Sequence, residues 1–155
     1  MIIGSSIEAF GRSAIPSALV RSYLDTVHRL VDPAPLGVRV GRTHHGLRTL
    51  MKLHGDVPAA FLTAWNPGSR PLSRRRNEAA QGELVAALDR RGLSHFRSWG
   101  HDALGADGPD PWPPEEGRVV LGLGLDEAAR LGRRFGQNAI AWAGLDGLPL
   151  LVALR

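Results

Sequence analysis

The residues best suited to chemistry follow a short apolar run in the middle of the chain. The stretch FLTAWNPGSRPLSRRRN, residues 61–77, places Asn66, Ser69, Arg70 and Asn77 between the end of a predicted strand and the start of a predicted helix. Amides, a hydroxyl and a guanidinium at such a strand end can line a crevice and bind a polar ligand. We therefore interpret this turn as one wall of a candidate binding site.

Three arginines open the predicted helix. Arg74, Arg75 and Arg76 lie in its first turn, where the helix dipole disfavours positive charge. An anionic ligand opposite them would offset this repulsion, whereas side chains that extend into solvent would feel little of it. An internal partner is a third interpretation, because residues 102–116 carry five acids and no lysine or arginine and could fold over the helix start. These acids are Asp102, Asp107, Asp110, Glu115 and Glu116.

A second group of polar residues precedes and follows the last predicted helix. Trp112 stands three and four residues before Glu115 and Glu116, and a carboxyl group beside apolar surface can have a raised pKa and act as an acid or base. The two glutamates are therefore the candidate catalytic residues and Trp112 a candidate ligand contact; alternatively, Trp112 anchors a proline-rich loop and both glutamates are solvated. Gln137 and Asn138 either satisfy the carbonyls at a helix end or bind the ligand.

Several common kinds of site have no matching pattern. The chain has no cysteine, which excludes disulfides, thiolate metal sites and cysteine nucleophiles. Its six histidines show no HxxxH or HExxH spacing, so we expect no metal site. The LGLGL run lacks the GxGxxG and Walker patterns, and no GxSxG elbow is present. We therefore expect no cofactor.

Composition indicates one globular domain. The chain has 155 residues, of which 43% are hydrophobic and 22% charged. Its net charge of +4 and pI near 10.9 would suit nucleic acid, but Lys52 is the only lysine, so arginine usage raises the pI without a matching excess of charge. No leader pattern and no apolar run of about 18 residues occurs, and we expect a cytoplasmic protein with no membrane partner.

Apolar periodicity and turn residues predict the elements that position these side chains. The predicted helices are residues 14–23, 43–53, 73–91 and 126–135, the last two capped by Ser73 and Asp126. The predicted strands are residues 26–31, 36–40, 59–65, 94–99, 118–123, 138–143 and 148–153. Between them, residues 100–116 are expected to form a long loop.

This pattern predicts an α+β fold with a single mixed β-sheet and about four helices packed on it. We expect residues 14–155 to form one domain. Residues 1–13 are small and polar, and we expect them to be disordered or ordered only by docking.

The motifs together resemble a bacterial family of domains of unknown function, the DUF3293 type. The resemblance rests on Leu62 to Pro67, on Asn77, on Trp112 with the two glutamates after it, and on FGQNAI at Phe135 to Ile140, and it spans roughly Tyr23 to Val152. This chain has WPPEEG where the family has a shorter Trp-x-Glu-Glu pattern, so the glutamate that matches the family's first one stays open. The resemblance implies that these motifs meet, either in a shared pocket or in a structural polar network, and it implies no particular activity.

The leading functional hypothesis is binding of a small polar, anionic ligand in a composite cleft. Arg70 and the arginines of residues 74–76 would supply charge, the amides hydrogen bonds, and Glu115 or Glu116 acid or base chemistry if the protein is an enzyme. A protein-interaction module that uses the basic helix start is the alternative, and nucleic-acid binding is the third hypothesis.

Overall fold

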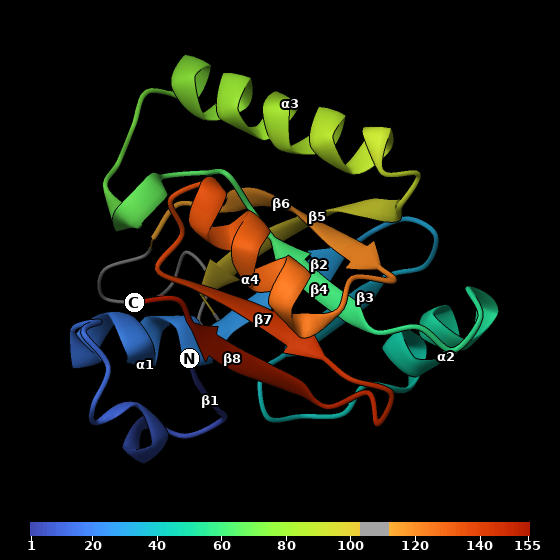
Figure 1. Cartoon of the computed structure of the whole chain (residues 1–155), viewed down its shortest axis with the longest axis horizontal. Helices are drawn as coiled ribbons and strands as arrows, with labels where there is room; N and C mark the ends of the chain where they lie inside the picture. Colours follow the sequence, from blue (N-terminus) through green and yellow to red (C-terminus); the bar gives the residue numbers. More distant parts are fainter. Residues whose placement is uncertain (103–111) are drawn as a thin grey trace.

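The computed structural model describes residues 1–102 and 112–155, which form one curled sheet of eight strands with helices on both faces (Figure 1). The strand order is β1-β8-β7-β4-β6-β5-β2-β3. The strands are β1 (Ile2–Gly4), β2 (Thr26–Leu30), β3 (Leu36–Arg39), β4 (Ala59–Leu62), β5 (Ser94–Asp102), β6 (Glu115–Leu121), β7 (Ala139–Ala143) and β8 (Pro149–Ala153).

The predicted α+β class, with a single sheet and four helices, is confirmed. The described sheet differs from the mixed one that we expected, because every strand pairing is antiparallel. Short turns join β2 to β3 and β7 to β8, and such turns allow only antiparallel neighbours.

Four α-helices in the described part of the chain cover the sheet. They are α1 (Ser17–Asp25), α2 (His45–Leu53), α3 (Arg74–Arg90) and α4 (Leu125–Arg134). Ser73 caps α3 as predicted, since its hydroxyl accepts a hydrogen bond from the Arg76 N–H. The cap of α4 is Gly124 rather than Asp126, which instead lies in the first turn, where its charge complements the helix dipole.

The sheet separates two apolar cores. Along β4, Ala59 and Phe61 belong to one core and Ala60 and Leu62 to the other, as the two-residue period of a strand requires. Buried residues of α1 and α2 pack in the first core, whereas buried residues of α3 and α4 pack in the second. The sheet is therefore covered on both faces, which explains the continuous apolar runs in its central strands.

The segment that we expected to be a long loop is shorter than predicted. Strand β5 continues to Asp102 and β6 begins at Glu115, because Gly100 pairs with Glu115 and Trp99 with Glu116. The sequence did not predict this extension of β5 and β6, because residues 100–116 are rich in glycine, proline and aspartate, and all three are depleted in strands.

Residues 1–13, for which we expected disorder or order by docking, include β1 at the edge of the sheet and a short 3₁₀ helix, Ile7–Phe10. Strand β1 pairs with β8, and Phe10 is buried in the core. The N-terminal segment thus contributes one strand and one core side chain.

Candidate functional site

A cavity of about 140 Å³ lies on the face of the sheet that α1 covers. Its apolar surface comes from Leu19 of α1 and from Phe61, Ala139, Ala141 and Leu151 of the central strands. Polar side chains from α1, β2, β5, β6 and three connecting segments surround this floor. The cavity combines a small apolar surface with a few polar groups, which is the usual composition of a small-molecule site.

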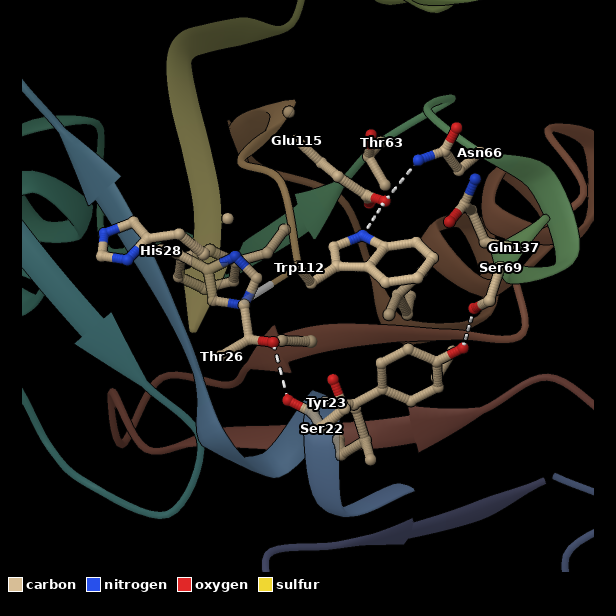
Figure 2. A pocket seen from close by; sticks show the side chains of 18 of the residues that line it. Ser22, Tyr23, Thr26, His28, Thr63, Asn66, Ser69, Trp112, Glu115 and Gln137 are labelled. Carbon is tan, nitrogen blue, oxygen red and sulfur yellow. Dashed lines mark hydrogen bonds between the residues drawn. The ribbon is translucent and has the colours of Figure 1, made fainter. Parts of the chain in front are cut away.

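Glu115, at the start of β6, is the most constrained polar group in the cavity. Its Oε1 atom accepts hydrogen bonds from Asn66 Nδ2 at 2.8 Å and from Trp112 Nε1 at 2.7 Å. Figure 2 shows these two donors converging on the carboxyl group from different segments. Among the described residues no hydrogen bond reaches Oε2, so this second oxygen is available to a ligand or a proton.

Two further contacts fix the orientation of the Asn66 amide. Its Oδ1 atom accepts hydrogen bonds from the Leu72 N–H at 2.9 Å and from Asn77 Nδ2 at 2.8 Å. Because the oxygen faces two donors, the nitrogen must face Glu115. Asn66 has a left-handed backbone, with φ 45°, which asparagine tolerates better than most residues.

Two side chains of helix α3 accept hydrogen bonds from the backbone of this segment. Asn77, only 2% exposed, accepts a hydrogen bond from the Asn66 N–H at 2.8 Å through Oδ1. One helical turn later, Gln81 Oε1 accepts from the Ala64 N–H at 2.9 Å. Asn77 therefore positions Asn66 instead of lining the cavity itself.

The surroundings of Glu115 favour its protonated form. Burial raises the pKa of Glu115, while the hydrogen bonds from Trp112 and Asn66 lower it in part. A carboxyl group in this position exchanges protons closer to neutral pH than an exposed glutamate does, which suits acid or base chemistry.

A second polar cluster closes the cavity beside α1. The hydroxyl groups of Tyr23 and Ser69 are hydrogen-bonded, and Asn138 Nδ2 donates to Tyr23 Oη at 3.0 Å and to Ser69 Oγ at 3.3 Å. Gln137 Nε2 donates to the Trp65 carbonyl at 3.2 Å, which leaves its Oε1 as the acceptor at the cavity. These contacts link α1, the Asn66 turn and the start of β7.

Not all of the predicted site residues lie at the cavity. It is lined by Asn66, Ser69, Trp112, Glu115 and Gln137, while Asn77 and Asn138 are bonded directly to members of that group. Glu116 is paired instead with Arg97 at 3.1 Å and Arg118 at 3.4 Å, outside the cavity lining. Successive strand residues point to opposite faces, so Glu115 and Glu116 could not share one pocket.

The predicted basic cluster also lies elsewhere. Arg70 and the arginines of residues 74–76 are exposed and are absent from the cavity lining. Arg74 pairs with Glu78 of its own helix at 2.6 Å. Within the proposed acidic partner, Asp107 and Asp110 lie outside the described residues.

Sequence reasoning missed the part of the cavity that β2 and the end of β5 contribute. Thr26 and His28 line it from β2, and His101 and Asp102 from β5. Burial, with a smaller contribution from His101, lowers the pKa of His28 to about 4. The strand predicted at residues 26–31 could have indicated this contribution. A period of two places His28 on the same face as the buried Leu30.

Two further features are absent from the described residues. No group of three or more histidine, aspartate or glutamate side chains there could hold a metal ion. None of the helices in that part of the chain is long and apolar enough to cross a membrane.

The fold and the cavity define an α+β protein with a covered antiparallel sheet and a small pocket against one helix. The chain belongs to the family described as "Protein of unknown function (DUF3293)", whose model matches residues 62–140. That range includes Asn66, Trp112, Glu115 and Gln137, whereas α1 and β2 lie before it. No curated protein and no solved structure matches the chain significantly.

Proposed function

We propose that this protein binds a small, partly apolar molecule in the cavity, with Glu115 as the polar anchor and proton-exchanging group. The observation that carries the proposal is the position of Glu115, which two donors from separate segments hold at an apolar floor. A carboxyl group positioned in this way loses hydration and retains an oxygen for a partner.

The charges around the cavity favour a neutral or cationic ligand over the anion that we expected from the sequence. Its described lining contains the carboxyl groups of Glu115 and Asp102 and two histidines, but no arginine or lysine. Residues 103–111 contain no arginine or lysine in their sequence either. An anion in this cavity would thus meet like charge without an opposing cation.

The remaining contacts indicate the shape and polarity of such a ligand. Phe61, Ala141 and Leu151 offer surface to an apolar portion, and the Trp112 ring can cover a flat one. Gln137 Oε1 and Glu115 Oε2 are acceptors, so the ligand should carry hydrogen-bond donors or a positive charge on the side that faces them.

A binding screen with a blocked-pocket variant tests the proposal. Neutral, cationic and anionic compounds of similar size are compared by ligand-observed NMR on the wild-type protein and on Ala139→Leu, in which the larger side chain fills cavity space. Leu145→Ala, at a site that is 68% exposed, is the control. Neutral or cationic compounds should bind wild type and the control but not Ala139→Leu.

Two results would contradict the proposal. One is binding that Ala139→Leu leaves unchanged although this variant is folded, since such binding would lie outside the cavity. The other is a consistent preference for anions that disappears when Arg70 and Arg75 are replaced by glutamine. Such a result would mean that the ligand binds at the start of α3 and not in the cavity.

A further inference from the structure

Three neighbouring strands place Glu115, Gly100 and His28 in one row. Glu115 on β6 is the register partner of Gly100 on β5, and Gly100 is in turn the partner of His28 on β2. Directly opposed residues of antiparallel strands have their side chains on the same face and their Cα atoms about 5 Å apart. Glu115 and His28 therefore stand about 10 Å apart by backbone position, on either side of Gly100 and on the cavity face.

The middle position of this row carries no side chain. A Cβ atom added at Gly100 would lie 3.4 Å from Thr26 Cγ2 and 3.9 Å from His28 Nδ1, which are ordinary contact distances. Because Gly100 also lines the cavity, the space above it is part of the binding volume. A ligand atom in that space lies between the backbone positions of His28, which carries the imidazole, and Glu115, which carries the carboxyl group.

The state of His28 suits a neutral hydrogen-bond donor. Its ring packs against Phe61 with the ring centroids 4.9 Å apart, and it has no hydrogen bond to another described residue. The pKa of about 4 keeps the imidazole uncharged at neutral pH, and a neutral imidazole carries one N–H. Glu115, whose pKa is raised, is in its ionised form a stronger base than an ordinary glutamate.

We propose that Glu115 and His28 together catalyse proton transfer at a carbon atom next to a carbonyl group, on a small carbonyl compound that lies over Gly100. This inference rests on the proposed binding function of the same cavity. Glu115 Oε2 takes the proton from the carbon, the C–H electron pair moves into the carbonyl, and the His28 N–H donates a hydrogen bond to the resulting enolate oxygen. Glu115 then returns the proton to the same carbon, or delivers one to the oxygen, so no other reactant is consumed.

The assignment of roles follows from the two environments. A carboxylate with a free oxygen removes protons, whereas an uncharged imidazole stabilises a developing negative oxygen without giving up its own proton. A base and a neutral imidazole on opposite sides of a substrate form a recurring arrangement for enolisation. Asn66 then acts as a positioning residue through Glu115, whereas Trp112 both positions Glu115 and offers its ring to the ligand.

Deuterium uptake by a simple ketone provides the test. Hydroxyacetone and 4-hydroxycyclohexanone, small ketones whose hydroxyl group is a donor for Gln137 Oε1, are incubated in D₂O with the full chain at neutral pH, and loss of the signal of the protons next to the carbonyl is followed by ¹H NMR. Saturation-transfer NMR on the same samples reports binding. Wild type should speed the exchange over buffer by about 10² or more, the range expected for general-base catalysis.

Four variants separate the roles. Glu115→Gln should bind the ketones and lose the acceleration, and His28→Leu should lose at least tenfold of it. His28→Gln, which restores an N–H donor, should recover part of that loss. Gly100→Val should abolish binding and exchange together, because its methyl groups occupy the space over the row. Backbone amide NMR spectra establish that each variant is folded.

Each outcome decides between the proposals. Bound ketone without accelerated exchange, or acceleration that survives Glu115→Gln, would overturn proton transfer and leave the binding function intact. Acceleration that is unchanged in His28→Leu would remove His28 from the mechanism. If neither ketone binds wild type, this inference fails, and the screen with Ala139→Leu decides separately whether the cavity binds another compound.

Discussion

Asn66 and Asn77 are joined by two hydrogen bonds, each 2.8 Å long, one from the Asn66 N–H to Asn77 Oδ1 and one from Asn77 Nδ2 to Asn66 Oδ1. Asn77 belongs to α3 on the far face of the sheet, whereas Asn66 reaches Glu115 in the cavity. The pair is therefore a direct connection between α3 and the candidate site.

Asn77→Ala should destabilise the protein and weaken the cavity together. The substitution leaves the buried Asn66 N–H without its acceptor and removes one of the two donors to Asn66 Oδ1, which costs about 2 kcal/mol in the free energy of unfolding. Urea unfolding measures this loss, and ligand binding by NMR should weaken because Asn66 no longer holds Glu115. Glu83→Ala, at an exposed position of the same helix, should change stability by less than about 0.5 kcal/mol. A stable Asn77→Ala protein would show that the turn is held by other contacts.

Glu115→Gln should become relatively more stable as the pH rises. The folded pKa of Glu115 lies above its ordinary value of 4.5, so its protonated form stabilises the fold below pH 4.5, and this contribution is lost as the pH rises through the folded pKa. Glutamine stays neutral throughout. The unfolding free energy of the variant minus that of wild type should therefore be larger at pH 7 than at pH 4.

Urea unfolding at the two pH values gives this difference, with the exposed Glu83→Gln as the reference substitution. A difference that is larger at pH 4 than at pH 7 would mean that the folded protein stabilises the carboxylate instead. Glu115 would then act as a fixed anion and not as a proton-exchanging group.

Local patterns were sufficient to predict most of the elements and the turn that lines one side of the cavity. The helix expected at residues 73–91 is Arg74–Arg90 in the structure, because its cap and its apolar stripe are both encoded within a few residues. The Asn66 turn was predicted for the same reason, since Asn-Pro-Gly-Ser interrupts an apolar run.

The other side of the cavity depends on long-range pairing that no local pattern encodes. His28 and Gly100 are register partners although 72 positions separate them, and their proximity follows from the place of β5 between β6 and β2. The choice between Glu115 and Glu116 depends on register in the same way, because a shift of one residue exchanges the faces of a strand. Arg70 and the arginines of residues 74–76 were predicted at the site because of their charge. Charge alone does not determine the direction in which a side chain points.

His28→Gln should protect the protein against mild acid. The folded pKa of His28 is about 4, below the ordinary 6.5, so the neutral ring stabilises the fold above pH 6.5 and this contribution is lost as the pH falls toward 4. The full effect is up to about 3 kcal/mol. Tyr23, His101, Asp102 and Glu115, which line the same cavity, are present in both proteins, so the comparison isolates His28.

Unfolding free energies at pH 7 and pH 4.5 check this expectation, and the exposed His45→Gln serves as the control. Wild type should lose more stability than His28→Gln over this interval. Equal losses of stability in the two proteins would mean that the His28 ring contacts water and that burial does not keep it neutral.

Arg75→Glu should stabilise the protein and leave ligand binding in the cavity unchanged. Arg75 is exposed in the first turn of α3, where a negative charge interacts favourably with the helix dipole by about 0.3 to 1 kcal/mol at low salt. Arg90→Glu is a matched control in the last turn of the same helix and should destabilise by a similar amount. Both changes in the free energy of unfolding should become smaller in high salt, which screens the helix dipole. If Arg75→Glu instead abolishes ligand binding, or removes a salt-sensitive association with an acidic protein or nucleic acid, the start of α3 is the functional surface and the cavity is not.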